Sequence, residues 1–302
     1  ATARNIGSQD LIAAPTVDTF DRVDSSIAQP GDEVGDVGFA LNTMIDNVET
    51  ALQARAESEQ RLRQFVADAS HELRTPLASI QGYTQLLQKG SADEELALAR
   101  IASESARMSG LVEDLLLLAR LDAGRELASD PVDLIPLAID AVSDAHAAGP
   151  DHEWVLDLPQ FDDEDEDCVS CTIAGDESAL RQVFANLVNN ARIHTPAGTR
   201  VKVGVRVIGG GASAPGFVRM SVADDGPGIP PELRATVFDR FVRGDTSRSR
   251  QGKGSSGLGL SIVSSIAEAL GGRVDVDTVC EGEAKPGEHG TTFSVILPAL
   301  GE

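Results

Sequence analysis

The sequence predicts an α-helical hairpin that forms a dimeric four-helix bundle, followed by an α+β domain. Three observations favour this fold class. Apolar residues recur with a period of about 3.5 over positions 62–87, a KGSADEE break precedes a second helical pattern, and strand-like segments mix with helical ones beyond residue 132. Mixed strands and helices are typical of an open sheet covered by helices. We therefore expect three parts, residues 1–50, 51–125 and 126–302.

The two helices of the hairpin are expected from about Asn47 to Gln88 and from about Glu94 to Leu121. The apolar seam of the first helix consists of Leu62, Val66, Ala69, Leu73, Pro76, Ile80, Tyr83 and Leu87. The stripe of the second helix consists of Ile101, Met108, Leu111, Val112, Leu115 and Leu118. Two helices cannot bury both stripes by themselves, so the sequence predicts a homodimer in which two hairpins pair.

One histidine of the first helix, His71, falls at the heptad position farthest from the seam and is expected to be exposed. Thr75 lies one turn further on the same face, and Glu72 lies beside the ring. Pro76 lacks an amide hydrogen, so we expect a bend in the helix there. An exposed helical histidine usually has no function. With a neighbouring carboxylate, a hydroxyl and a bend, however, His71 becomes a candidate nucleophile.

Composition excludes some classes of function. A formal net charge of −23 over 302 residues argues against a nucleic-acid partner, since phosphate backbones attract basic surfaces. No apolar run approaches the roughly 20 residues that span a membrane. Cys168 and Cys171 form a lone CVSC without a second pair, and we interpret them as ordinary thiols near a strand.

In the C-terminal part, segments with the periodicity of strands alternate with segments that have the periodicity of helices. The expected strands are HEWVLDL, TRVKVGVRVIG, PGFVRMSVADD, GRVDVDTV and TTFSVILP, and the second and third are joined by a glycine-rich hairpin loop. The expected helices are DESALRQVFANLVNNARIHT and SSGLGLSIVSSIAEALGG. The strand segments and helical segments follow one another along the chain, and two of the strands are joined by a short loop. This order favours an open sheet with helices packed against it.

Four motifs in this part have the chemistry of a nucleotide site. Asn186 and Asn190 lie four apart on one helix face, where amide oxygens suit a hard cation such as Mg²⁺. In VADDGPGI, Asp224 can accept a hydrogen bond from an exocyclic amine, and Gly226 and Gly228 permit close approach of the backbone. The third motif, VFDRFVRGD, combines aromatic and arginine residues.

The fourth motif, GKGSSGLGLSIV, is a glycine-rich segment that leads directly into a helix. Amides at a helix N-terminus favour phosphate groups. The segment lacks the GK[ST] of a P-loop and does not follow a strand, so neither a Walker site nor a Rossmann site fits. Each motif also has an ordinary structural interpretation, and it is their order and spacing that point to function.

In that order, HELRTPL, NLVNNARIHT, DDGPGI, FDRFVRGD and GLGL resemble the H, N, G1, F and G2 boxes of bacterial two-component sensor histidine kinases. The resemblance covers about residues 60–300. PGDEVGDVGFALNTMI resembles the second half of a HAMP relay domain, with Asp32, Glu33 and Gly35 in its DExG signature. This resemblance implies the cytoplasmic portion of a membrane receptor, with a GHKL-type (Bergerat) ATP-binding sandwich as its last domain.

The resemblance also implies roles for individual residues. His71 is the expected phosphoacceptor, Glu72 orients and deprotonates its ring, and Thr75 positions water for dephosphorylating a partner regulator. ATP and Mg²⁺ are the expected cofactors, and a receiver domain is the expected partner. The lid spans about residues 231–256. Nucleotide-binding positions are Asn186, Asn190, Asp224, Gly226, Gly228, Ile229, Arg243, Lys253, Gly257, Leu258 and Gly259, with Asn186 and Asn190 also the metal ligands.

The sequence departs from the family pattern in its N box. Ile193 stands where a lysine often contacts phosphate and His194 where a tyrosine is usual, so Arg192, or Arg243 and Lys253, are candidates to compensate. Ser255 replaces the first glycine of GxGLGL. Two alternatives remain open: a GHKL ATPase whose ATP drives only conformational change, which has no need of HELRTPL, and a catalytically weak signalling scaffold.

Overall fold

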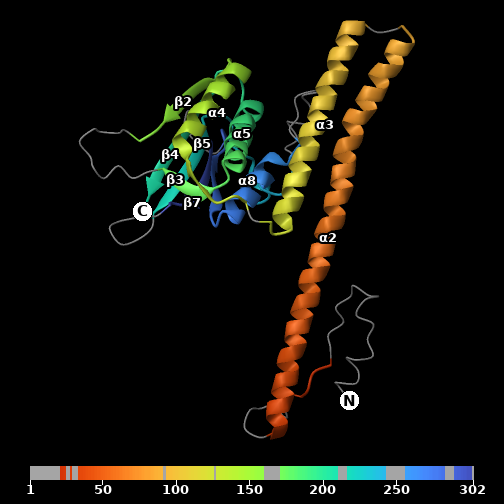
Figure 1. Cartoon of the computed structure of the whole chain (residues 1–302), viewed down its shortest axis with the longest axis vertical. Coiled ribbons are helices and arrows are strands. Elements are labelled where there is room, and N and C mark those ends of the chain that lie inside the picture. Colours follow the sequence, from red (N-terminus) through yellow and green to blue (C-terminus); the bar gives the residue numbers. More distant parts are fainter. Residues whose placement is uncertain are drawn as a thin grey trace, which may run out of the picture. The chain divides into compact units, whose positions relative to one another are not determined.

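The computed structural model describes residues 21–24, 28, 33–90, 93–125, 127–159, 171–209, 216–242, 256–282 and 289–300. It divides into two compact units, Ala1–His71 and Glu72–Glu302. Figure 1 traces the chain from the long helix at its N-terminal end to the strands at its C-terminal end. Among the helices that the structure describes, none is long and apolar enough for a membrane span.

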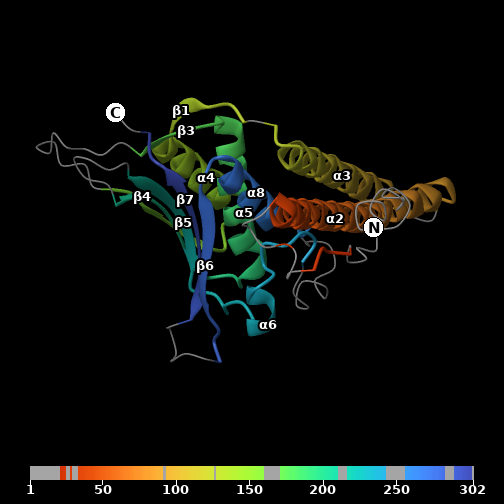
Figure 2. The ribbon, with the colours of Figure 1, turned by 90° about the horizontal axis from the view of Figure 1, so that it is seen from below.

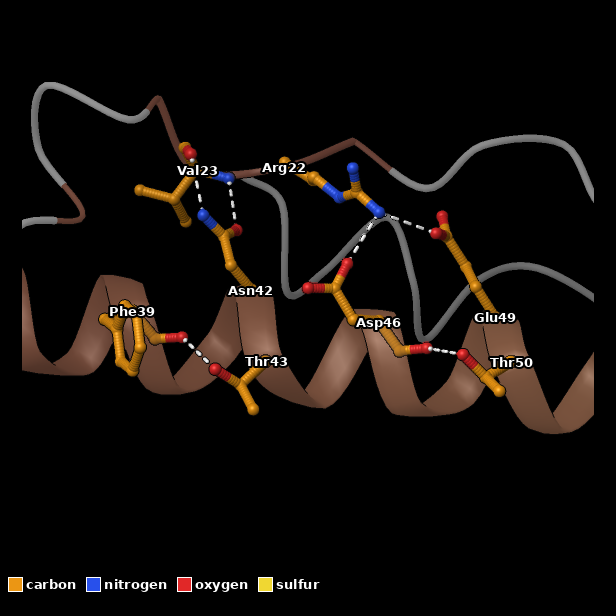
Figure 3. Close-up of polar contacts among 8 residues, drawn as sticks. All are labelled: Arg22, Val23, Phe39, Asn42, Thr43, Asp46, Glu49 and Thr50. Atoms are coloured by element: carbon orange, nitrogen blue, oxygen red, sulfur yellow. Dashed lines mark hydrogen bonds and ion pairs between the residues drawn. The ribbon is translucent and has the colours of Figure 1, made fainter.

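Among the described residues, the first unit comprises the N-terminal part of α2 (Glu33–Gln88), a short segment, residues 21–24, that lies along it, and Ala28. The side chain of Asn42 bonds the backbone of Val23 twice, accepting from its N–H at 2.9 Å and donating to its carbonyl at 3.0 Å (Figure 3). Arg22 forms ion pairs with Asp46 at 2.6 Å and with Glu49 at 2.7 Å. These contacts fix the segment to the helix.

Helix α2 begins earlier than the predicted first helix of the hairpin. We expected a turn and a helical pattern within residues 30–48 and a sustained helix from about Asn47, and the structure joins the two in one helix that begins at Glu33. Glu33 and Asp36 in the first turn favour this start, because carboxylates stabilise the positive end of a helix. Residues 33–46 thus belong to the same helix.

In the second unit, the remainder of α2 and α3 (Glu94–Asp122) form the predicted hairpin. Asp93 caps α3, its carboxylate accepting from the amide of Leu96 at 3.1 Å. Pro76 lies inside α2 and is buried, and the helix continues to Gln88. The second half of the predicted seam is half-buried or buried, whereas Leu62 and Val66 are 61% and 55% exposed.

The C-terminal domain contains a five-stranded mixed sheet, ordered β2-β4-β5-β7-β6. Neighbouring strands are antiparallel except for β2 and β4, which are parallel. The strands are β2 (Glu153–Asp157), β4 (Arg200–Ile208), β5 (Phe217–Asp224), β6 (Arg273–Val279) and β7 (Gly290–Pro298). This confirms the predicted α+β sheet, including the hairpin between β4 and β5.

Three helices cover one face of this sheet: α4 (Leu134–Ala148), α5 (Glu177–His194) and α8 (Gly259–Ala269) (Figure 2). Their apolar faces meet the inward-facing residues of the strands in one core, where Phe184, Met220 and Ile262 are almost fully buried. The short helix α6 (Pro231–Arg234) follows β5. Helix α4 and the small antiparallel pair β1 (Asp130–Asp133) and β3 (Thr172–Gly175) were not predicted.

Of the two cysteines in the CVSC motif, the structure describes Cys171. Cys171 is buried, and its carbonyl accepts from the amide of Leu134 at 3.2 Å at the start of β3. It is therefore a core residue beside a strand, as predicted. Cys168 lies outside the described residues.

Candidate nucleotide-binding site

A cavity of about 690 Å³ lies between α5, the loop after β5 and the start of α8. This volume falls in the range of small-molecule sites. Residues of the N box, the G1 loop and the G2 turn, which lie far apart in the sequence, meet in its wall. The predicted residues that line it are Asn186, Asn190, Asp224, Gly228, Ile229, Gly257 and Gly259.

Helix α5 presents two different faces. Asp176 caps its N-terminus, accepting from the amides of Ser178 at 2.9 Å and Ala179 at 3.1 Å. One face is apolar and packs into the core through residues such as Val183, Phe184 and Leu187. Because helical residues four apart share a face, Asn186, Asn190 and His194 form a polar row along the cavity.

Asn186 has the surroundings of a ligand-binding amide. Its Oδ1 accepts from Gln182 Nε2 at 3.5 Å, and its Nδ2 is buried without a hydrogen-bond partner among the described residues. A buried polar atom without a partner is costly unless a ligand satisfies it. The unpartnered Nδ2 is a donor and suits a phosphate oxygen, whereas the amide oxygens of Asn186 and Asn190 are of the kind that a hard cation takes as ligands.

Asp224 ends β5 at the other side of the cavity. Burial raises the pKa of its carboxyl to about 6, while hydrogen bonds from the backbone N–H groups of Gly226 and Thr291 act in the opposite direction. At neutral pH the carboxylate form predominates, and it can accept a hydrogen bond from an exocyclic amine.

The G1 glycines act through close packing. A Cβ atom at Gly226 would lie 2.7 Å from Thr195 Cγ2 and 2.8 Å from Asp224 Oδ1. Gly228 has a φ of +78°, and a Cβ there would lie 2.3 Å from the carbonyl oxygen of Val279. Gly226 itself is not part of the cavity wall; it is buried behind Asp224 and positions that carboxylate.

Ile229 lines the cavity where the G1 loop meets β6. Its amide donates to Thr278 Oγ1 at 2.8 Å, and its carbonyl accepts from Arg234 Nε at 2.9 Å and from the Cys280 thiol at 3.0 Å. These bonds hold the loop in place around an apolar side chain that can contact a flat ring.

The residues of the G2 turn lie in two different environments, the cavity wall and the core. Gly257 and Gly259 line the cavity, and a Cβ at Gly259 would meet Asn186 Oδ1 at 3.4 Å. Phe241 donates its amide to the carbonyl of Gly257 at 2.7 Å, which joins the F box to this turn. Leu258, which we had placed among the lining residues, is instead fully buried in the core and anchors the turn from behind.

Two predicted lid residues, Arg243 and Lys253, lie outside the described residues. Sequence reasoning did not single out several other residues of the cavity wall, among them Asp114 of α3, Thr195 and Cys280. Burial raises the pKa of Asp114 to about 6, with repulsion from Glu113 adding to the effect. Gln182 Nε2 approaches its carboxylate at 3.5 Å. Nothing in the heptad pattern distinguishes Asp114 from an ordinary surface acid.

The predicted phosphotransfer residues lie on α2. His71 and Thr75 are exposed, as their heptad positions predict, whereas Glu72 is half-buried. Arg107 of α3 lies 4.0 Å from the Glu72 carboxylate and 3.7 Å from that of Glu104. Glu72 is thus linked electrostatically to the second helix of the hairpin.

Comparison with known proteins agrees with this arrangement. Residues 175–301 match the family described as histidine kinase-, DNA gyrase B- and HSP90-like ATPase, and residues 61–124 match the His Kinase A (phospho-acceptor) domain. The chain is 52% identical over 283 residues to the probable sensor histidine kinase TcrY of Mycobacterium tuberculosis, covering 93% of this chain and 55% of that protein.

A second relative is the signal transduction histidine-protein kinase/phosphatase MprB of Mycobacterium leprae, which is 34% identical over 276 residues, or 88% of this chain and 48% of the relative. The chain spans about half the length of these relatives. The solved complex of histidine kinase ThkA with response regulator protein TrrA has the same fold, at 23% identity and a TM-score of 0.58, over 82% of this chain and 64% of the ThkA chain.

The chain therefore belongs to the two-component sensor histidine kinases, with a phospho-acceptor helical hairpin followed by a GHKL-type ATP-binding domain.

Proposed function

We propose that this chain autophosphorylates His71 with ATP and passes the phosphoryl group to an aspartate of a response regulator. The observation that carries the proposal is the meeting of Asn186, Asn190 and Asp224 in one cavity. The match of residues 61–124 to a phospho-acceptor domain favours a kinase over a GHKL ATPase without phosphotransfer.

The proposed chemistry is in-line phosphoryl transfer. A ring nitrogen of His71 forms a bond to the γ-phosphorus while the bond from that phosphorus to the β–γ bridging oxygen breaks, and ADP leaves. Glu72 orients the ring by accepting a hydrogen bond from the other ring nitrogen, and it takes the proton from that nitrogen as the lone pair of the attacking nitrogen forms the bond to phosphorus. The remaining work is positioning and charge stabilisation.

In the nucleotide domain, Asp224 accepts from the adenine amine, and Ile229 packs against the ring. Asn186 and Asn190 hold Mg²⁺, which neutralises phosphate charge when it is bound. The flanking glycines Gly228, Gly257 and Gly259 let the backbone approach the nucleotide, and Gly226 and Leu258 support the wall. Arg243 and Lys253 are proposed lid contacts to the phosphates.

The partners are also part of the proposal. Leu62 and Val66, exposed on this single chain, would be covered by a second copy in a four-helix homodimer. The ThkA complex supports a response regulator as partner, and MprB, a named kinase/phosphatase, supports a phosphatase role for Thr75. We further propose that residues 1–50 belong to a HAMP relay and that this chain is the cytoplasmic portion of a membrane receptor.

The test is incubation with γ-labelled ATP and Mg²⁺, beside His71→Gln and Asn190→Ala. Acid-labile, alkali-stable label on the wild type and on neither variant would support the proposal. Nucleotide binding without any label would favour the scaffold alternative. Label that persists in His71→Gln would place the phosphoacceptor elsewhere.

A further inference from the structure

One histidine of the C-terminal domain, His289, contacts the G1 loop from outside the cavity. It lies directly before β7 and is not among the described residues of the cavity wall. Its Nδ1 lies 2.7 Å from the carbonyl oxygen of Gly226. A carbonyl oxygen can only accept a hydrogen bond, so Nδ1 is the donor, and the neutral ring carries its proton on Nδ1.

Through this contact, Gly226 is bonded at both of its backbone groups. Its N–H donates to Asp224 Oδ1 at 2.9 Å, and its carbonyl accepts from His289. The glycine is also buried, and a Cβ atom there would lie 2.7 Å from Thr195 Cγ2. A displacement of the Gly226 carbonyl would therefore move the amide that orients the Asp224 carboxylate.

The two residues that follow His289 also contact Asp224. A Cβ atom at Gly290 would lie 2.1 Å from the backbone oxygen of Asp224, so only a glycine allows the strands to approach this closely. Thr291 faces Asp224 in the register of β5 and β7, and its backbone N–H donates to the carboxylate. Residues 289–291 thus support the acid together, and His289 is the one that does so through its side chain.

We propose that His289 is a positioning residue of the nucleotide site. By holding the Gly226 carbonyl, it sets the Asp224 carboxylate where that group accepts from the amine of adenine. The inference deepens the proposed function and rests on it, since it requires adenine against Asp224. Because His289 acts through Gly226 and Asp224, its effect falls on recognition of the base and not on binding of the phosphates.

The experiment compares the affinities of ATP and purine riboside triphosphate, which has a hydrogen in place of the 6-amino group, by calorimetry with Mg²⁺. Only ATP can donate to Asp224, so the ratio of the two affinities measures that contact, whereas a damaged fold lowers both affinities alike. In His289→Ala we expect the preference for ATP to fall roughly fivefold, as the loss of one hydrogen bond implies, with the affinity for purine riboside triphosphate unchanged.

Two further variants make the comparison specific. His289→Asn should restore the wild-type preference, because the asparagine amide can donate from about the position of Nδ1. The matched control is His146→Ala, which removes an exposed histidine of α4 outside the described cavity wall and should keep the wild-type preference.

The position of the ring proton gives an independent readout. Nitrogen-15 NMR of histidine-labelled protein, in solution well above the ordinary histidine pKa of roughly 6.5, distinguishes a proton on Nδ1 from one on Nε2. The signal that disappears in His289→Asn belongs to His289, and we expect it to show the proton on Nδ1.

Three results would overturn the inference: an unchanged preference for ATP in His289→Ala, equal loss of both affinities, or a neutral ring with its proton on Nε2. A wild type that binds both triphosphates equally well would overturn the role of Asp224, and the inference with it, while nucleotide binding stands. A wild type that binds neither would overturn the proposed function itself.

Discussion

The Asp224 carboxylate accepts a hydrogen bond from the amide of Gly226 at 2.9 Å, across the turn that ends β5. This short bond orients one oxygen toward its own loop and fixes the side chain at the cavity wall. Asp224 and Gly226 of the DDGPG motif therefore act as one unit. Because Gly226 has no side chain, the Asp224 carboxylate can occupy its position at the cavity wall.

The first prediction follows from this pair. In Gly226→Ala the new methyl group would overlap Thr195 and Asp224, so we expect ATP affinity to fall at least about tenfold, as one misplaced charged hydrogen bond implies. Fluorescent-nucleotide titration measures the effect. Gly282→Ala, where nothing lies within 4 Å, is the control. Wild-type affinity in Gly226→Ala would contradict the assignment.

The second prediction concerns stability and pH. The pKa of Asp114 is raised from 3.8 to about 6 in the fold, so the folded state holds the proton more tightly than the unfolded state between these values. The contribution of Asp114 to stability therefore declines as the pH rises from about 4 to 6. We expect Asp114→Asn to unfold at a temperature roughly 2–4 °C higher than the wild type at pH 7.5, and the gap to close near pH 4.

Thermal unfolding across this pH range measures the gap. Asp224 titrates in the same direction but is present in both proteins, so it does not affect the comparison. A variant that is less stable than the wild type at pH 7.5 would mean that the Asp114 carboxylate gains more from Gln182 than it loses by burial.

The third prediction concerns Pro76, which is buried inside α2 one turn after Glu72. Pro76 leaves the carbonyl of Glu72 without its helical donor, and alanine would restore that bond. We expect Pro76→Ala to change the ratio of autokinase to regulator-phosphatase activity. Both rates are measured with the purified regulator, and unchanged rates of both would refute the role.

The fourth prediction separates the two contacts that hold residues 21–24. The amide of Val23 donates to Asn42 Oδ1, so Asn42→Ala should speed hydrogen exchange at Val23 severalfold. Arg22→Ala removes two ion pairs of a half-exposed arginine, which contribute about 0–1 kcal/mol each, and should change that exchange little. Equal effects of the two variants would show that the ion pairs contribute as much as the Asn42 hydrogen bonds.

The sequence predicted the elements whose periodicity is strong. The amphipathic pattern of α5 and the alternation in β4, β5 and β7 gave their positions to within one or two residues. Helix α4 was not predicted, although its buried residues Leu134, Leu137, Ala138 and Ala145 recur at helical spacing. The apolar but exposed Ile139 interrupts that pattern in the sequence. Strands β1 and β3 have four residues each and exist only by pairing with each other, which local pattern does not encode.

For the candidate site, the sequence identified some residues and missed others. Asn186, Asn190 and Asp224 carry chemistry in their residue type, so a motif identifies them. Asp114 reaches the cavity from another part of the chain, and only tertiary packing brings it there. Leu258 shows the opposite error: it lies within a binding motif, yet its side chain contributes to the core.

One of the two edge strands of the described sheet, β6, alternates half-buried residues with exposed ones, among them Arg273, Asp275 and Asp277. An edge strand is a template on which another chain can add a strand, and charges along it make such addition unfavourable. Together with the net charge of −23, these residues predict that the domain resists aggregation through its open sheet edge at high protein concentration.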